Sequence, residues 1–494
     1  MTGFSRHGLK KGLLATTLVA VLLSLLAREA PGQDLPEEKA TALEAVQALA
    51  PDMVDMSMAL WDYSELALRE EASAEYLADY LEAEGFGVER GVAGMPTAFV
   101  ASWGRGEPII GILAEYDALP NIGNAPVPYK KPREDGHPHG QGCGHNVFGA
   151  ASVAAAVALQ RTMEEHGLRG TVRLYGAPAE ETVVGKVYMA KAGLFDDLDM
   201  AMDWHPGDET GVRNSSGQAM NNFEVEFFGQ AAHAAGDPWN GRSALDAVEL
   251  MNYGANLMRE HVRPTTRIHY VIPSAGEAPN VVPEYARVWY YVRDTARAPV
   301  ESHYDRLLKM AEGAAMSTGT EHQVSLVTGV HALLLNRPLQ EAMQANLEAV
   351  GPPAFTAEDQ AFARELQASL GIEEKGLSTE IQPLKPEPEP AGGGSTDVAE
   401  VSWIAPEVGV RVATTAADVP WHSWAVSASH GTRGAVRGGE VAAKVLALTG
   451  VDVLLRPELL QEARAFFQEK TGGRPYESPV PADQEPPLPE KGGE

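Results

Sequence analysis

Cysteine is nearly absent from this sequence of 494 residues, in which Cys143 is the only one. A lone cysteine cannot form an internal disulfide, so Cys143 is expected to be buried, bound to a ligand or reactive. Positive charge is also scarce, with 39 Lys and Arg against 68 Asp and Glu and a formal net charge of -29. This imbalance argues against DNA, RNA and anionic membrane surfaces as partners, because all three attract basic patches. We expect a protein that acts on small molecules.

The apolar run at the N-terminus is too short to be a typical membrane span. It covers residues 12–27, against the roughly 20 residues that a spanning helix needs. Basic residues precede this run and the small residues Ala30, Pro31 and Gly32 follow it, an order typical of a secretory signal peptide. We therefore predict that residues 1–32 are a signal peptide and that the protein is secreted or periplasmic, with no stable membrane span after cleavage. An uncleaved anchor is the alternative.

The rest of the composition indicates a globular protein, with 44% hydrophobic and 22% charged residues. A chain of this length exceeds a single core, so we expect two domains. Short apolar runs alternate with helical stretches over residues 33–214, and this α/β texture returns over residues 331–473. Between them, residues 215–330 show half-exposed strands and two helices, which predicts an inserted α+β domain. Residues 474–494 lack apolar content and are predicted to be a disordered tail.

Side chains of the types that bind zinc, manganese and similar ions stand at successive predicted strand ends. They are, in order, Asp117, Cys143, His145, Glu180, Glu181 and His205, followed much later by His422 and His430. Because polar strand ends gather at one edge of an α/β sheet, where ligands bind, their coincidence predicts a metal site. Each residue alone has an ordinary structural explanation. A nucleophilic Cys143 paired with His145 is the rival chemical hypothesis.

Eight motifs in order extend this pattern, namely "AEYDALP", "GCGHN", "GAPAEE", "DWHP", "GQAAHAAGDPWNGRSALDAV", "APNVVPEYARVWYYVR", "GGGSTD" and "PWHSW". Through them the sequence resembles the metal-dependent amidohydrolases related to aminoacylases, hippurate hydrolases and bacterial carboxypeptidases. The strongest resemblance is to the branch that contains p-aminobenzoyl-glutamate hydrolase. It implies a two-domain α/β metallohydrolase with a mixed-sheet α/β/α catalytic domain. Residues 215–330 would then form the α+β lid and dimerisation domain.

The resemblance also implies a site for two divalent metal ions in each protomer. The ligands that it assigns are Cys143, His145, Glu181, His205 and His422. In this branch a thiolate bridges the two metals, so that role falls to Cys143. Glu180 would be the general base, since its neighbour is committed to metal, and Asp117 would orient a ligand from behind. The donor set suits zinc or manganese, with cobalt also possible.

The implied reaction is hydrolysis of the amide bond of N-acyl or N-aroyl amino acids, or of dipeptides, by metal-activated water. His233 of the lid would stabilise the oxyanion together with a metal. In the family this histidine often comes from the neighbouring protomer, so His233 should lie far from the metals in an open monomer. The carboxylate of a small N-acyl amino acid substrate would be bound by Asn280, Arg293 and the backbone at Gly394.

A different class of function stays open at this point. The chain could be a non-catalytic, metal-containing binding or partner subunit, although Glu180 beside a full ligand set favours an enzyme, because a binding module has no use for a base. A homodimer is expected, with a hetero-oligomer containing a paralogous chain as the alternative. The sequence assigns no role to Glu115 or His430.

Overall fold

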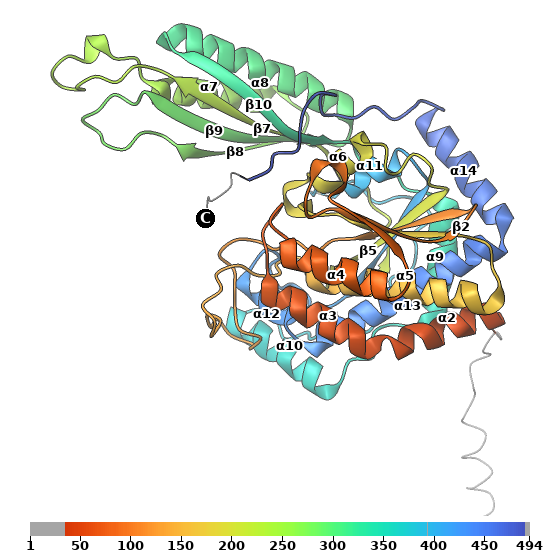
Figure 1. Ribbon diagram of the computed structural model, residues 1–494. Coiled ribbons are helices and arrows are strands. Elements are labelled where there is room, and N and C mark those ends of the chain that lie inside the picture. Colours follow the sequence, from red (N-terminus) through yellow and green to blue (C-terminus); the bar gives the residue numbers. More distant parts are fainter. Residues whose placement is uncertain (1–34, 393, 490–494) are drawn as a thin grey trace, which may run out of the picture.

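Two β-sheets organise the part of the chain that this computed structural model describes, residues 35–392 and 394–489 (Figure 1). The predicted signal peptide, residues 1–32, lies outside the described residues. The larger sheet has seven strands in the order β1-β2-β4-β3-β5-β11-β6, and the smaller has four in the order β10-β7-β9-β8. None of the described helices is long and apolar enough to cross a membrane.

The larger sheet is mixed. Strands β3, β4, β5 and β11 pair in parallel, whereas β1, β2 and β6 add antiparallel strands at its edges. Its strands are β1 (Gly87–Arg90), β2 (Phe99–Arg105), β3 (Ile109–Ala114), β4 (Gly170–Gly176), β5 (Met200–Gly207), β6 (Gly211–Val212) and β11 (Glu407–Ala413).

Helices cover both faces of this sheet (Figure 1). The longer ones are α2 (Glu37–Ala48), α3 (Ala50–Tyr63), α4 (Glu71–Ala83), α5 (His145–His166), α9 (Arg337–Val350), α10 (Ala357–Leu370), α13 (Arg433–Leu455) and α14 (Pro457–Thr471). The shorter ones are η1 (Val92–Gly94), η2 (Glu180–Thr182), α6 (Gly185–Lys191), α11 (Val398–Ser402) and α12 (Trp424–His430).

Strand β5 shows how the sequence divides its side chains between the two faces. Successive residues of a strand point to opposite sides. Met202 and Trp204 therefore enter the core that includes α5 and α13, while Asp203 and His205 point to the other face. Strand β11 alternates in the same way beside it. One face of these two strands is thus apolar, and the other carries polar groups toward a cavity.

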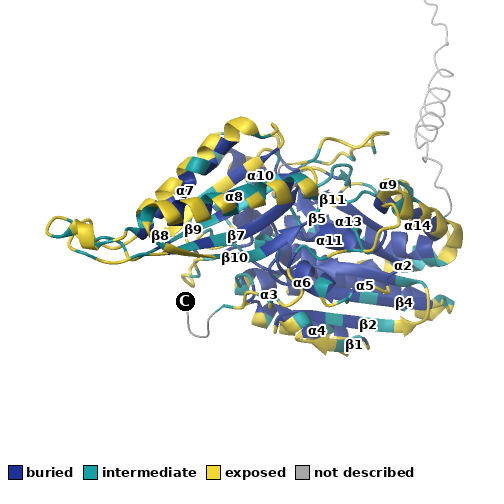
Figure 2. Ribbon diagram, turned by 90° about the horizontal axis from the view of Figure 1, so that it is seen from above, coloured by how far each residue is buried: buried dark blue, intermediate teal, exposed yellow. Residues whose placement is uncertain are grey.

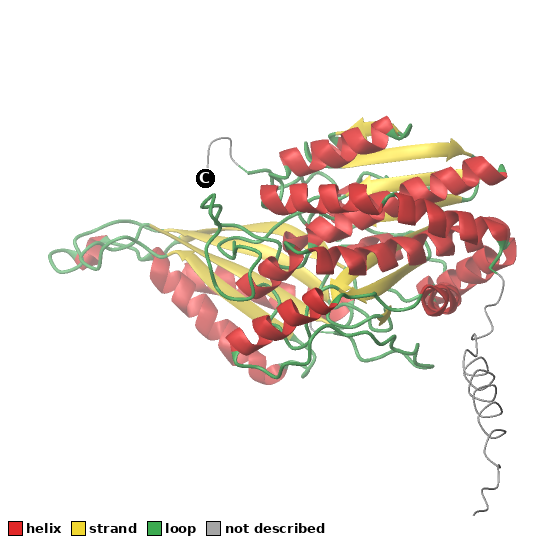
Figure 3. Cartoon of the chain, turned by 90° about the horizontal axis from the view of Figure 1, so that it is seen from below, coloured by secondary structure: helices red, strands yellow, loops and turns green. Residues whose placement is uncertain are grey.

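The inserted domain, residues 219–330, contains the smaller sheet. Its elements are β7 (Ala219–Phe228), η3 (Pro238–Asn240), α7 (Ala244–Met258), η4 (Arg259–His261), β8 (Arg267–Ser274), β9 (Tyr285–Asp294), α8 (Arg297–Thr318) and β10 (Glu321–Val330). Both long helices pack on one face of the four antiparallel strands (Figure 3). The mixed sheet and the separate antiparallel sheet confirm the predicted α/β fold class with an added α+β unit.

The end of the chain differs from the prediction of a disordered tail over residues 474–494. In its described part the hydroxyl of Tyr476 donates to Glu400 at 2.6 Å, and Val480 is buried. The side-chain amide of Gln484 donates to backbone oxygens of β10. The tail runs from α14 to the inserted domain (Figure 1). The composition of this segment predicts disorder, but the contacts of Tyr476, Val480 and Gln484 with the rest of the protein give it a defined path.

Candidate metal centre

The "GCGHN" motif places two candidate ligands on either side of Gly144, the residue that precedes helix α5. Gly144 has φ of 75°, in the left-handed region that favours glycine. A Cβ at this position would also run into the ring of His430. Gly144 therefore allows the tight turn that brings Cys143 and His145 close together. Helix α5 begins at His145, directly after this turn.

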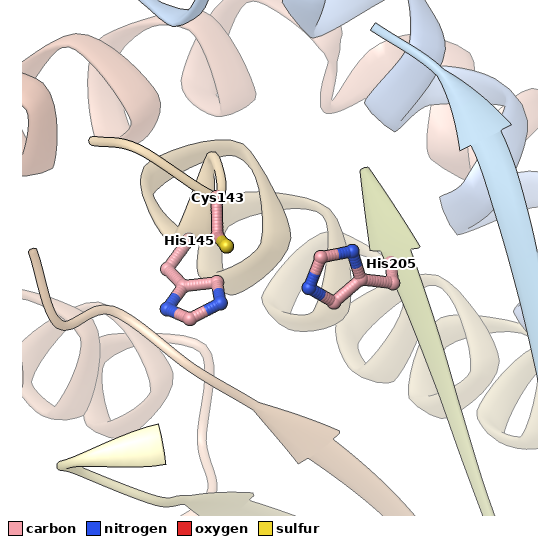
Figure 4. Close-up of side chains that lie close together, drawn as sticks. All are labelled: Cys143, His145 and His205. Carbon is pink, nitrogen blue, oxygen red and sulfur yellow. The ribbon is translucent and has the colours of Figure 1, made fainter. Parts of the chain in front are cut away.

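Cys143, His145 and His205 form a first group whose donor atoms lie within 4.8 Å of one another. Figure 4 shows the three side chains facing a common point, two from the start of α5 and one from the end of β5. Nδ1 of His145 lies 2.8 Å from Asp117 Oδ1, and Nδ1 of His205 lies 2.7 Å from the carbonyl oxygen of Pro206. With Nδ1 occupied in this way, Nε2 of each ring is left to bind a cation.

Cys143 also belongs to a second group, with Glu181 and His422, and these donor atoms again lie within 4.8 Å of one another. The sulfur lies 3.0 Å from His422 Nε2, and that nitrogen lies 3.5 Å from Glu181 Oε2. The backbone N–H of Glu181 donates to Asp117 at 2.9 Å, so Asp117 supports both groups. The sulfur of Cys143 is thus the donor atom that these two groups of three have in common.

Glu115, His145 and Glu180 form a third group of close donor atoms. Glu115 is fully buried, with Oε1 2.7 Å from Lys186 Nζ and Oε2 3.2 Å from His145 Nε2. The second contact is short enough for an ion pair but does not have hydrogen-bond geometry. Glu180, the candidate base, thus stands next to the donor groups without being one of the donors around the sulfur.

Lys186 and Asp397 complete the site, and no sequence pattern singled out either residue. Nζ of Lys186 lies 2.7 Å from Asp397 Oδ1, and its backbone N–H donates to Asp397 Oδ2 at 2.7 Å. Both residues are completely buried. Asp397 ends the "GGGSTD" motif, in which the sequence assigned a role only to the backbone at Gly394. Lys186 lies in a stretch that the sequence predicts to be an ordinary helix. A buried lysine between two carboxylates offsets part of the negative charge of the site.

Left-handed backbone brackets the two glutamates. Ala179 has φ of 58° and Val183 has φ of 60°, one on each side of η2. His422 has φ of 56°. Such values are costly for residues with a Cβ and concentrate at functional sites, where the surrounding structure enforces them. The local backbone is therefore shaped to present these side chains.

The site contains buried acidic groups that bound cations would stabilise. Burial, followed by the charges of Glu181 and Glu180, raises the pKa of the Cys143 thiol, and burial raises the pKa of Glu181 to about 7. Several buried atoms of the site make no hydrogen bond among the described residues, namely Glu115 Oε2, His145 Nε2 and Glu181 Oε1. Cations would satisfy these lone pairs and reverse the pKa shifts. The donors fit two divalent metal ions.

A cavity of about 710 Å³ opens over these residues. Cys143, Glu180 and Glu181 line it from the larger domain, while Arg293 and Gly394 line it from the side predicted to bind the substrate carboxylate. Arg293 extends from β9 of the inserted domain, where burial lowers its pKa. The cavity therefore lies between the metal donors and the inserted domain.

Two predicted residues lie elsewhere. His233 and Asn280 are exposed and do not line the cavity. They neighbour each other, because the carbonyl of Asn280 accepts from the backbone N–H of Ala234 at 3.0 Å. In this chain they form a surface of the inserted domain, separate from the metal donors.

His430 is a packing residue. Its Nδ1 lies 3.0 Å from the carbonyl oxygen of Val426, and its Nε2 lies 2.9 Å from the hydroxyl of Thr414. Burial lowers its pKa to about 4, so the ring is neutral at neutral pH. With both nitrogens occupied, His430 supports Gly144 and has no donor atom to offer a metal.

The fold and this donor set define a metallopeptidase-type hydrolase. Residues 111–410 match the family described as peptidase family M20/M25/M40. The chain belongs to this family, and the predicted amidohydrolase class is confirmed.

Particular relatives narrow the comparison. The chain is 37% identical to one of the subunits of p-aminobenzoyl-glutamate hydrolase in Escherichia coli, over 90% of this chain and 97% of the relative. It is 30% identical to the Xaa-Arg dipeptidase of Mus musculus, over 87% and 92% of the two chains. Its fold is similar to that of a dinuclear metal-binding M20 peptidase of Bacillus subtilis, with a TM-score of 0.52 and 20% identity over 81% of this chain and 99% of the other.

Proposed function

We propose that the chain is a two-metal amidohydrolase that cleaves the amide bond of N-acyl or N-aroyl amino acids, or of dipeptides. The observation that carries this proposal is the sharing of Cys143 by two donor groups, with Glu180 next to them. The names of the relatives, which are a dipeptidase and a component of p-aminobenzoyl-glutamate hydrolase, support this range of substrates. Two divalent cations held by the donors would polarise the scissile carbonyl and make water more acidic.

The chain supplies the proton transfers and the positioning. Glu180 lines the cavity, and its pKa is raised well above the ordinary value by burial and then by the charge of Glu115. It takes a proton from the attacking water and returns it to the leaving nitrogen. Arg293 and the backbone at Gly394 bind the carboxylate of the substrate. Closure of the inserted domain, or a second protomer, brings His233 to the developing oxyanion.

Turnover by matched proteins tests this proposal. The unaltered protein and Glu180→Gln are loaded in turn with zinc, manganese or cobalt. They are then assayed with p-aminobenzoyl-glutamate, N-acetyl and N-benzoyl amino acids and dipeptides. The variant should keep its metal and lose about a hundredfold to ten-thousandfold in kcat. Equal rates in the two proteins would contradict the role of Glu180, and a metal-loaded protein that turns over no substrate would favour the non-catalytic binding role.

The outer face of the inserted domain supports an oligomer. Leu250, Tyr253 and Leu257 recur on one side of α7 with 42%, 62% and 56% of their surfaces exposed. Val271 and Ile272 are exposed on β8, which is an edge strand of its sheet. Figure 2 shows this exposure along α7 and β8. A second copy, or a paralogous chain, would cover this apolar surface.

Export is a separate proposal that rests on residues 1–32 alone. A protein released from a signal peptide would meet acylated amino acids or dipeptides that arrive from outside the cell. N-terminal sequencing of the protein recovered from a periplasmic fraction tests the cleavage. A chain that still begins at Met1 would contradict it.

A further inference from the structure

Arg411 reaches the cavity from the strand next to His205. In the parallel pairing of β11 with β5, Arg411 lies directly opposite His205. Opposed residues of paired strands project to the same face of a sheet. Both residues line the cavity, and the main chain at Arg411 is held by strand pairing on both sides, with β5 and with β6. Its side chain therefore borders the cavity from a rigid element, on the same face of the sheet as a metal donor.

The neighbouring strand makes room for this side chain. A Cβ at Gly207 would meet Cγ and Cδ of Arg411, at 2.6 Å for Cδ. Real Cβ contacts are not this close, so the arginine stem lies over the glycine because no side chain is there. This packing places the stem over the end of β5, on the face of the sheet that also carries His205.

Arg411 differs from the other cations that the larger domain contributes to the cavity. Arg213 is bonded to Asp203 and Glu407, and Lys385 pairs with Glu389. Within residues 35–392 and 394–489, the guanidinium of Arg411 makes neither a hydrogen bond nor an ion pair. In a chain with a net charge of -29, an arginine beside a substrate cavity and without a carboxylate partner is available to bind an anion.

Arg411 lies on the side of the cavity formed by the larger domain, level with His205 in the sheet. The carboxylate contacts proposed above come from another direction, from Arg293 on β9 and from the backbone at Gly394. Two separate cationic positions therefore border one cavity.

We propose that Arg411 determines specificity by binding a second carboxylate of the substrate, distinct from the α-carboxylate assigned to Arg293 and Gly394. This inference rests on the proposed amidohydrolase function. The second carboxylate could come from the acidic side chain of the amino acid or from a dicarboxylic acyl group. Either one offers the two oxygens that a guanidinium binds in parallel.

Two pairs of compounds that differ by one charge separate these sources. The first pair is N-acetyl-glutamate and N-acetyl-glutamine, and the second is N-succinyl-leucine and N-succinamyl-leucine. Turnover and equilibrium binding of all four are measured on metal-loaded protein, on Arg411→Gln and on Arg411→Lys. Lys385→Gln serves as the matched control, because it removes the same charge from a lysine that already has a carboxylate partner.

In one of the two pairs, Arg411→Gln should raise KM and weaken binding about tenfold to a hundredfold for the compound with the second carboxylate, which is N-acetyl-glutamate or N-succinyl-leucine. Its kcat should be nearly unchanged. The amide member should be unaffected, Arg411→Lys should recover part of the loss, and Lys385→Gln should behave as the unaltered protein. Equal losses for both members, or no loss, would overturn the role of Arg411. Binding that depends on Arg411 without any turnover would instead refute the proposed hydrolysis and leave the anion site standing.

Discussion

The sulfur of Cys143 lies 3.0 Å from Nε2 of His422, although 279 positions separate the two residues. Cys143 is buried just before α5, whereas His422 is exposed on the loop between β11 and α12. Two distant segments of the chain therefore meet at one sulfur atom. This meeting point is where both donor groups overlap.

Replacement of this sulfur should empty the site. Cys143→Ser is expected to lower metal affinity by at least about a hundredfold and to lose activity in parallel, because a serine hydroxyl stays protonated near neutral pH and supplies no bridging charge. Metal content per protomer, measured by elemental analysis after gel filtration, checks this. A variant that keeps two metals per protomer with only a modest loss of stability would show that Cys143 is merely a buried side chain.

Glu70 should give the metal-free protein a pH-dependent stability. Its carboxyl accepts hydrogen bonds from Ala179 N at 2.8 Å and from the Thr97 hydroxyl at 3.0 Å. Burial, and then the charge of Asp117, raises its pKa to about 8 from an ordinary value of 4.5. The folded state therefore binds this proton more tightly. The resulting stability is present below the ordinary pKa and is lost as the pH rises to about 8.

Glu70→Gln should consequently flatten the decline in unfolding free energy between about pH 5 and pH 8, since the amide has no proton to lose. Urea unfolding of the metal-free protein across this range measures the effect. The control is Glu71→Gln, at the adjacent exposed position, which should decline with pH as the unaltered protein does. An unchanged decline in Glu70→Gln would assign the pH dependence to other groups.

The contact between Tyr476 and Glu400 should be measurable as stability. Tyr476→Phe leaves a buried carboxylate oxygen without its 2.6 Å donor and should lower the free energy of unfolding by about 1–3 kcal/mol. Tyr129→Phe is the matched control, because Tyr129 is 53% exposed. Equal stabilities of the two variants would mean that the tail contributes nothing through this hydroxyl.

Charge on the outer face of α7 should dissociate the proposed oligomer. Tyr253→Glu is expected to weaken self-association by roughly tenfold or more, because burying an unpaired carboxylate in an interface is costly. Analytical ultracentrifugation over a concentration series measures the equilibrium. Tyr129→Glu places the same change on the larger domain and should leave it unaltered. Loss of association in both variants, or in neither, would contradict an interface on α7.

The sequence indicated the metal donors because they stand in short motifs at the ends of apolar runs. Such runs form neighbouring strands, and the ends of these strands lie close together at one edge of the sheet. The role of Lys186 could not be predicted from the sequence, for a physical reason. Its partners are remote in sequence, with Asp397 211 positions away, and a helical stretch gives no sign that one lysine will be buried. Arg411 was missed because the strand that carries it was not recognised, so its place beside His205 could not be inferred.

The tail has a mechanical consequence for the two domains. An inserted domain is joined to its host by two covalent connections, here just before β7 and just after β10, and it can rotate about the line between them. Direct hydrogen bonds from Tyr188 to Val327 and from Thr328 to Val183 also join the two domains. Gln484 adds a further attachment, since its amide donates to the backbone of β10 and to the hydroxyl of Tyr188 on α6 at once. Rotation of the inserted domain relative to the larger one would therefore have to stretch or break the bonds of Gln484, which couples such a movement to the end of the chain.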